Sequence, residues 1–175
     1  MKKVTYYFTS VVLFFLVASF NSPDNDKVQW MSVAELQTAY TKAPRPIIVD
    51  VYTSWCGWCK VMDKETYRNA NVANYINEHF YAVKLDAETK EVFDWNGKQY
   101  RYNDAYQSNE LAVYLMGGNM SYPTTVLLPS LTSQPGPMAG FLKPKELEAP
   151  LKFFAEGNYR ITTYQQFIQS FKGSW

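Results

Sequence analysis

Cysteine is scarce in this sequence: its 175 residues contain only two, Cys56 and Cys59. Exported proteins that depend on disulfides for stability usually contain several cysteines that close long loops. A bridge between residues only three positions apart removes very little unfolded-state entropy. The pair is therefore poorly placed to stabilise a fold and well placed to carry out chemistry.

Charge of one sign is also lacking, because 17 Lys and Arg residues face 16 Asp and Glu residues and the formal net charge is +1. Without a basic run beyond the first residues, nucleic-acid binding has no electrostatic footprint. Without charge blocks, a disordered tail is not expected either. Histidine occurs once, as His79 within a predicted helix. Since structural zinc requires four ligands, a metal site at the two cysteines is a minor alternative, and no metal or cofactor is expected besides a Cys56–Cys59 disulfide.

The N-terminal segment differs in composition from the rest. Two lysines precede an uncharged and largely apolar stretch, Val4–Phe20, and polar residues follow it at once. A basic start, an apolar centre and small residues near its end are typical of a secretory signal peptide. We therefore expect residues 1–22 to be a signal peptide and the protein to be exported to the periplasm or cell envelope. The alternative is an uncleaved membrane anchor, although this stretch has 17 residues and about 20 are needed to span a bilayer.

The remaining chain is rich in core-forming residues, with 47% hydrophobic and 17% aromatic residues. Its patterning predicts alternating strands and helices, and hence an α/β sandwich around a central mixed β-sheet flanked by helices. We expect a linker at 23–27, a compact domain at 28–156 and a C-terminal helical extension at 157–175. Residues 87–107 lack periodicity and are predicted to be an inserted loop with some local structure. The predicted strands are 47–52, 80–85, 124–128 and 138–142, and the predicted helices are 33–42, 56–65, 71–79, 109–116, 144–155 and a short one after 162.

The two cysteines follow a predicted strand and begin a predicted helix. A helix N-terminus favours negative charge, so the pKa of Cys56 should be lowered and its thiolate available. Cys59 lies one turn further on the same helical face, within reach of a disulfide. An exposed attacking thiolate beside a shielded resolving thiol is what thiol–disulfide exchange requires. The spacing therefore predicts a redox-active CxxC motif.

The segment from Asp50 to Lys60, DVYTSWCGWCK, resembles the active-site stretch of the thioredoxin family, with Trp58 at the position of thioredoxin's proline. Tyr122-Pro123-Thr124 is similar to the family's cis-proline segment, and Gly140 to the glycine of its last strand. The run Cys59–Thr66 resembles exported bacterial thioredoxin-like proteins of the disulfide-reductase type. The resemblance covers roughly residues 30–156 and implies a thioredoxin-like three-layer sandwich, with the insertion before the cis-proline as an addition.

The resemblance also implies roles for individual residues. Cys56 would be the nucleophile, Cys59 the resolving thiol, and Asp50 a buried acid of raised pKa that exchanges a proton with Cys59. The alternative for Asp50 is an ordinary carboxylate at a strand end, and Lys84 on the next strand is a candidate partner for it. The expected substrate-binding residues are Trp55, Gly57, Trp58, Tyr122 and Pro123.

Together these features predict a thioredoxin-like protein-disulfide reductase of the cell envelope. With two cysteines there is no internal relay, so a reducing role requires an external electron donor, for which a membrane thiol transporter is expected. The expected substrates are proteins that contain disulfides. Two alternatives remain: an oxidase or isomerase of disulfides, since the residues between the cysteines tune the potential, and a non-catalytic adaptor that binds a protein partner through the fold and its aromatic insertion.

Overall fold

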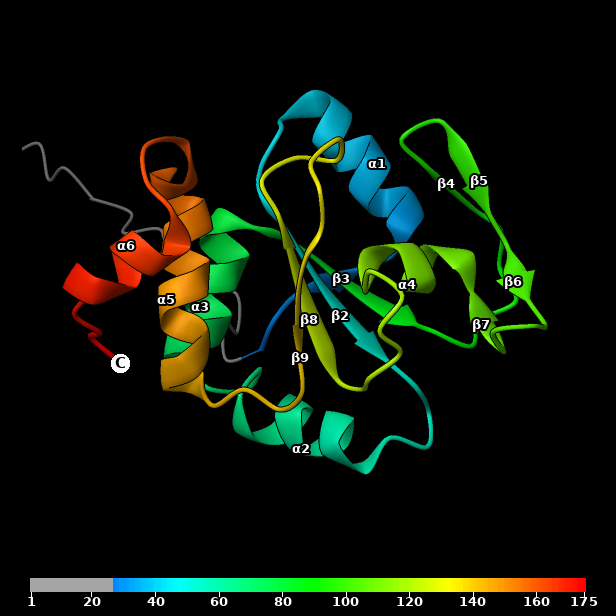
Figure 1. Cartoon of the computed structure of the whole chain (residues 1–175), viewed down its shortest axis with the longest axis horizontal. Helices are drawn as coiled ribbons and strands as arrows, with labels where there is room; N and C mark the ends of the chain where they lie inside the picture. The colour runs from blue at the N-terminus through cyan, green and yellow to red at the C-terminus, as the bar shows by residue number, and fades with distance from the viewer. Residues whose placement is uncertain (1–26) are drawn as a thin grey trace, which may run out of the picture.

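The structure, a computed structural model, describes residues 27–175, so the expected signal peptide and most of the expected linker lie outside the described residues. Within this part of the chain a five-stranded sheet has the order β1-β3-β2-β8-β9 (Figure 1). Strands β1, β2 and β3 are parallel, and β8 and β9 are antiparallel to their neighbours. The sheet is therefore mixed, as expected. Its strands are β1 (Trp30–Met31), β2 (Ile47–Tyr52), β3 (Tyr81–Asp86), β8 (Thr124–Leu128) and β9 (Gly136–Ala139).

Strand β2 lies at the centre because its β-branched side chains are buried on both faces. Ile47, Val49 and Val51 belong to one core cluster, together with apolar residues of α1 (Val33–Lys42) and α4 (Glu110–Leu115). Ile48 points to the opposite cluster, beneath α2 (Gly57–Glu65), α3 (Ala70–His79) and α5 (Pro144–Ala155). This alternation produces a sandwich of three layers, and Figure 1 shows α3 and α5 on one side of the sheet and α1 and α4 on the other.

Local signals in the sequence account for the ends of several helices. Ser32 caps α1 through a capping box with Glu35. Asn69 caps α3, and Pro144 occupies the first turn of α5. After α5 the chain forms a short 3-10 helix (Asn158–Arg160) and then α6 (Tyr164–Ser170), which packs its aromatic residues against Phe153 of α5. No helix among residues 27–175 is both long enough and apolar enough to cross a membrane.

The insertion is more ordered than the sequence predicts. In the structure the insertion runs two residues past the expected 87–107, to Asn109, and contains two strand pairs, β4 (Phe93–Trp95) with β5 (Lys98–Tyr100) and β6 (Tyr102–Asn103) with β7 (Ser108–Asn109). Asn96 and Gly97 connect the first pair with positive φ angles of 52° and 75°, the conformation that an Asn-Gly hairpin turn requires. Trp95 is buried in the same cluster as α1. The insertion is therefore anchored to the core.

Among the strands of the central sheet, β3 spans Tyr81–Asp86, one residue later than the expected 80–85, and two others differ more from the sequence-based prediction. The short β1 is absent from that prediction, because two residues are too few to produce a periodic signal. The last strand is expected at 138–142 but spans Gly136–Ala139. It ends there because Gly140 turns the backbone to a φ of 95°, which leaves the extended region. Pro137 is compatible with this strand because β9 is an edge strand.

Candidate active site

The disulfide between Cys56 and Cys59 lies where β2 leads into α2. Cys56 is the N-cap of α2, and the Cα atoms of the two cysteines are 5.4 Å apart. The backbone N–H of Cys59 donates to Cys56 Sγ at 3.0 Å. This is the interaction that would stabilise negative charge on Cys56 in the dithiol. Both residues are 4% exposed, so the expected contrast between an exposed Cys56 and a shielded Cys59 is not present in this disulfide form. Their positions differ in that Cys56 caps the helix while Cys59 lies one turn inside it.

Asp50 is a carboxyl group inside the sheet, with 2% of its surface exposed. Strand alternation places it on the same face of β2 as Ile48, the face that packs against Met62 of α2. Among residues 27–175, Asp50 Oδ1 has no hydrogen-bond partner. Burial raises the pKa of Asp50 to about 7, and the positive charge of Lys84 opposes part of this rise. Asp50 can therefore change its protonation state near neutral pH.

Lys84 connects Asp50 with a second carboxylate. The parallel register places Lys84 of β3 directly opposite Asp50, and Lys84 Nζ lies 3.6 Å from Asp50 Oδ2. The same ammonium group contacts Asp63 Oδ1 of α2 more closely. The pairing of Lys84 with Asp50 is a candidate from the sequence, whereas sequence reasoning misses Asp63. Its only sequence signal is its position one helical turn after Cys59, on the side of α2 that faces the sheet.

Tyr67, which follows α2, is a second residue of this group that sequence reasoning misses. It is 2% exposed, and its hydroxyl shares a hydrogen bond with Thr125 Oγ1 at 3.0 Å. Thr125 is in turn the register partner of Asp50 on β8. Burial and the nearby Asp50 charge raise the pKa of Tyr67 well above its ordinary value. The phenol therefore stays neutral and is a fixed polar neighbour of the buried acid.

The Lys84–Asp63 pair lies at a cavity of about 230 Å³ that is also lined by Trp30, Tyr67 and Arg68. Lys84 and Asp63 line this cavity, whereas Asp50 does not. The buried carboxyl thus adjoins a charged group that reaches a cavity, rather than a purely apolar wall.

Exposed aromatic side chains flank the disulfide. Trp55 is 64% exposed and Trp58 is 63% exposed, although tryptophan is on average a highly buried residue. Trp55 packs edge to face against Tyr122 with ring centroids 5.8 Å apart, and Trp58 lies 5.7 Å from the ring of Phe141. The structure thus places exposed aromatic surface at the residues next to the cysteines in the chain, where a partner molecule could contact it.

The Tyr122–Pro123 peptide bond is cis. Pro123 is buried, and its carbonyl oxygen accepts a hydrogen bond from Gly140 N at 2.7 Å. The three segments with a thioredoxin-like sequence are therefore linked: Trp55 contacts Tyr122, and Pro123 contacts Gly140. Gly57 is exposed, and a Cβ atom built on it meets no atom within 4 Å, so its predicted contact with substrate stays a prediction.

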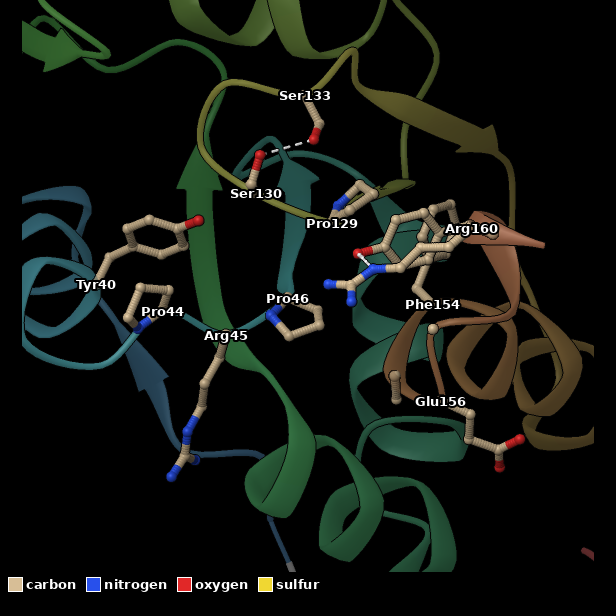
Figure 2. A pocket seen from close by; sticks show the side chains of 13 residues that line it. Tyr40, Pro44, Arg45, Pro46, Pro129, Ser130, Ser133, Phe154, Glu156 and Arg160 are labelled. Atoms are coloured by element: carbon tan, nitrogen blue, oxygen red, sulfur yellow. Dashed lines mark hydrogen bonds between the residues drawn. The ribbon is translucent and has the colours of Figure 1, made fainter.

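A larger cavity, of about 550 Å³, lies at the other end of the sheet (Figure 2). Pro46 immediately precedes β2 and Pro129 immediately follows β8, and both line this cavity. Arg160 reaches into the cavity in Figure 2, and its Nε–H donates a hydrogen bond to the Tyr159 hydroxyl at 3.0 Å. The cysteines follow the opposite end of β2, so this cavity does not belong to the disulfide site. Within residues 27–175 no group of three or more potential metal ligands occurs.

The fold and the disulfide place this protein in the class of thioredoxin-fold proteins of the thiol–disulfide oxidoreductase type. Its sequence matches the family model Thioredox_DsbH, described as a protein of unknown function, DUF255, over residues 20–146. The chain therefore belongs to this family. The cis-proline segment and the CxxC motif both fall inside the matched range.

Solved structures are similar in fold. A thioredoxin-fold protein from Helicobacter pylori superposes with a TM-score of 0.56 at 18% identity, covering 84% of this chain and 89% of that one. A structure described as DsbH oxidoreductase has a TM-score of 0.52 at 16% identity, covering 86% and 95%. At these identities the similarity establishes the fold.

Curated relatives match over short segments. The uncharacterized protein B0495.5 of Caenorhabditis elegans is 36% identical over 69 residues, which are 38% of this chain and 9% of that protein. The thiol:disulfide interchange protein DsbD of Pectobacterium atrosepticum is 35% identical over 46 residues, which are 26% of this chain and 8% of that protein. The matched segments thus span less than a tenth of either relative.

Proposed function

We propose that this protein is a thiol–disulfide oxidoreductase of the bacterial cell envelope that reduces protein disulfides through Cys56 and Cys59. The observation that carries the proposal is the disulfide at the start of α2, where the N–H of Cys59 points at Cys56 Sγ at 3.0 Å. A sulfur in this position is a good leaving group and, when reduced, a good nucleophile.

In the reducing direction the Cys56 thiolate attacks one sulfur of a substrate disulfide. A mixed disulfide between Cys56 and the substrate forms, and the first substrate thiolate leaves. The Cys59 thiolate then attacks Cys56 Sγ, which forms the Cys56–Cys59 disulfide and releases the second substrate thiolate. Two electrons pass from the dithiol to the substrate, and the two protons lost by the dithiol balance those taken up by the substrate thiolates.

Asp50 serves in this scheme as the acceptor of the Cys59 proton. It lies on the face of β2 that packs against α2, and its pKa of about 7 keeps a substantial fraction ionised at neutral pH. A general base works best when its pKa is close to the working pH. The proton returns to solvent by way of Lys84 and Asp63, which line the cavity. Because an ammonium group has no lone pair, Lys84 first donates a proton to the Asp63 carboxylate, which releases it to solvent, and then takes up the proton of Asp50.

The substrate binds in this scheme across the surface formed by Trp55, Gly57, Trp58, Tyr122 and Pro123. Tyr122 packs against Trp55, which precedes Cys56, so the proposed binding residues adjoin the disulfide. The reducing direction requires an external dithiol to reduce Cys56–Cys59 after each turnover. A membrane thiol transporter fits this need, and the similarity of one segment to the relative named as a thiol:disulfide interchange protein supports such a partner.

Reduction of insulin disulfides with dithiothreitol as the electron source tests the activity. The wild type should show steady turnover, and Cys56→Ser should abolish it. Binding of a protein partner without any turnover would instead support the adaptor. The equilibrium potential against glutathione decides the direction, since a potential well above that of glutathione would favour an oxidase.

Export rests on the N-terminal segment and is tested separately. The mature protein should be recovered from the envelope with an N-terminus near residues 20–23. An intact Met1 in a membrane fraction would support the uncleaved anchor, and recovery from the cytoplasm would contradict export.

A further inference from the structure

The insertion is attached to the aromatic residues beside the disulfide. Trp55 and Tyr122 pack edge to face, with ring planes at 86°, and we call this pair the aromatic wall. Trp55 Nε1 donates to Glu88 Oε1 at 2.9 Å. The hydroxyl of Tyr122 lies 3.4 Å from Ser108 Oγ. One residue from each end of the insertion thus holds one member of the wall.

The two ends of the insertion form a single support. Asn109 is fully buried, and its side-chain amide donates to the carbonyl oxygens of Thr89 at 3.2 Å and Glu91 at 2.8 Å. Its backbone N–H donates to the carbonyl oxygen of Ala87 at 2.6 Å. These bonds fix the segment that carries Glu88 next to the strand that carries Ser108. The two residues therefore cannot shift independently.

The support is also fixed to the central sheet. The backbone N–H of Ala87 donates to the carbonyl oxygen of Tyr52, the last residue of β2, at 2.8 Å. The backbone N–H of Glu88 donates to Asp86 Oδ1 at 3.0 Å. Since β2 also leads to Cys56, the disulfide and the support are both attached to the C-terminal end of the same strand. The distance between the wall and the reacting sulfurs is thereby set by the fold.

A fixed wall has a consequence for substrate selection. An exposed tryptophan without a partner samples several rotamers, and a ligand that uses it must order it on binding. The hydrogen bond to Glu88 orders the indole before the substrate arrives, while 64% of Trp55 stays exposed. Ordering in advance improves binding because this cost is not incurred again. The exposed surface is aromatic, so it gains most from an apolar side chain of the substrate.

We propose that the insertion is a specificity element, in which Glu88 and Ser108 hold the aromatic wall so that it binds an apolar side chain next to the cysteine of an extended polypeptide substrate. Glu88 and Ser108 are positioning residues, since they act through Trp55 and Tyr122. The inference rests on the proposed function.

Two peptide substrates, each containing a disulfide, test the proposal. They differ only in the residue beside the cysteine, which is Leu in one peptide and Ser in the other. Bis(2-hydroxyethyl) disulfide, a small neutral substrate with no side chain for the wall, reports the chemistry alone. The wild type should reduce the Leu peptide about fivefold more efficiently than the Ser peptide, a ratio typical of partial burial of one leucine. The difference should arise in KM rather than in kcat.

Glu88→Ala should bring the Leu/Ser ratio close to one and should lower efficiency more for the Leu peptide than for the small disulfide. Glu88→Gln replaces the carboxylate by an amide whose oxygen can still accept the indole N–H, so it should retain the ratio. Ser108→Ala should lower the ratio by a smaller factor, because its contact with Tyr122 is longer. Glu91→Gln is the matched control, as Glu91 is an exposed acid on the same segment whose side chain does not contact the wall.

The outcomes separate the two levels of the proposal. A wild type that reduces none of the three disulfides contradicts the proposed function itself. A wild type that reduces all three without preferring Leu, or a Glu88→Ala variant that keeps the preference, overturns the specificity element. If Glu88→Gln and Glu88→Ala lower the Leu/Ser ratio equally, the charge of Glu88 matters rather than its hydrogen bond. This result would overturn its positioning role.

Discussion

Replacing Asp50 by Asn should make the disulfide form of the protein more stable, by an amount that depends on pH. Burial raises the pKa of Asp50 from 3.8 to about 7. Between these values the folded state keeps a proton that the unfolded state has lost. Wild-type stability therefore falls as pH rises through this window. One pKa unit corresponds to about 1.4 kcal/mol, so the whole window amounts to about 4 kcal/mol.

The amide introduced by Asp50→Asn does not titrate, so the variant should not incur this loss. Its advantage in free energy of unfolding over the wild type should start to grow near pH 4 and level off above pH 7. Urea denaturation of both proteins from pH 4 to pH 8 measures it, with equal m-values as the check on two-state unfolding. The cysteines do not contribute, because they are joined as a disulfide throughout.

Asp104→Asn is a suitable control, because Asp104 is an exposed carboxylate in the insertion. It removes one carboxylate from the surface rather than from the sheet, and so serves as the reference for the loss of a negative charge. A difference in stability between Asp50→Asn and the wild type that does not change with pH would refute the raised pKa of Asp50. The relay has its own test: Asp50→Asn should slow release of the mixed disulfide at neutral pH, and an unchanged rate would show that Asp50 does not take the proton.

In the reduced protein, iodoacetamide near neutral pH should modify Cys56 much faster than Cys59, and equal rates would contradict their assigned roles. Asp63→Asn removes a negative charge that raises the pKa of Asp50, so the pH window in which stability falls should end at a lower pH in urea denaturation. Desolvation acts to raise the pKa of Glu148, but its hydrogen bonds outweigh this and lower it to about 2. Glu148→Gln should therefore lower the free energy of unfolding by about 3 kcal/mol at pH 7, at about 1.4 kcal/mol per pKa unit, and this loss should disappear as pH falls from 4.5 to 2.

The central strand and the helix that bears the cysteines can be predicted because their signals are local. The β-branched run at Ile47–Tyr52 has the pattern of a strand buried on both faces, and the structure has those bounds. The CxxC spacing at the start of a helix brings the two sulfurs together without help from distant residues. Short-range patterning of this kind survives in the folded protein because tertiary packing reinforces it.

The surroundings of Asp50 can be predicted only in part, because they depend on how distant segments align. Lys84 is distant in sequence and meets Asp50 through the register of β2 and β3. Asp63 and Tyr67 approach from α2 and the turn after it, and no periodic signal fixes that docking. The Asn-Gly pair at 96–97 is a different case: it is a hairpin signal in the sequence, but the strands beside it are too short for their alternation to distinguish them from a loop.

The site thus divides into two parts that come from different stretches of the chain. Residues 50–67 supply the disulfide, the buried acid and two of its neighbours, Asp63 and Tyr67, whereas Lys84 and Thr125 come from β3 and β8. The reacting sulfurs and the acid thus depend on β2 and α2. Trp55 belongs to this stretch, but Glu88 and Tyr122, which fix its orientation, come from the insertion and from the cis-proline segment. Changes in the insertion can therefore alter which substrate is held without displacing the sulfurs. In the proposed scheme, substitutions near Asp50 should change pH profiles, and substitutions near Glu88 should change KM.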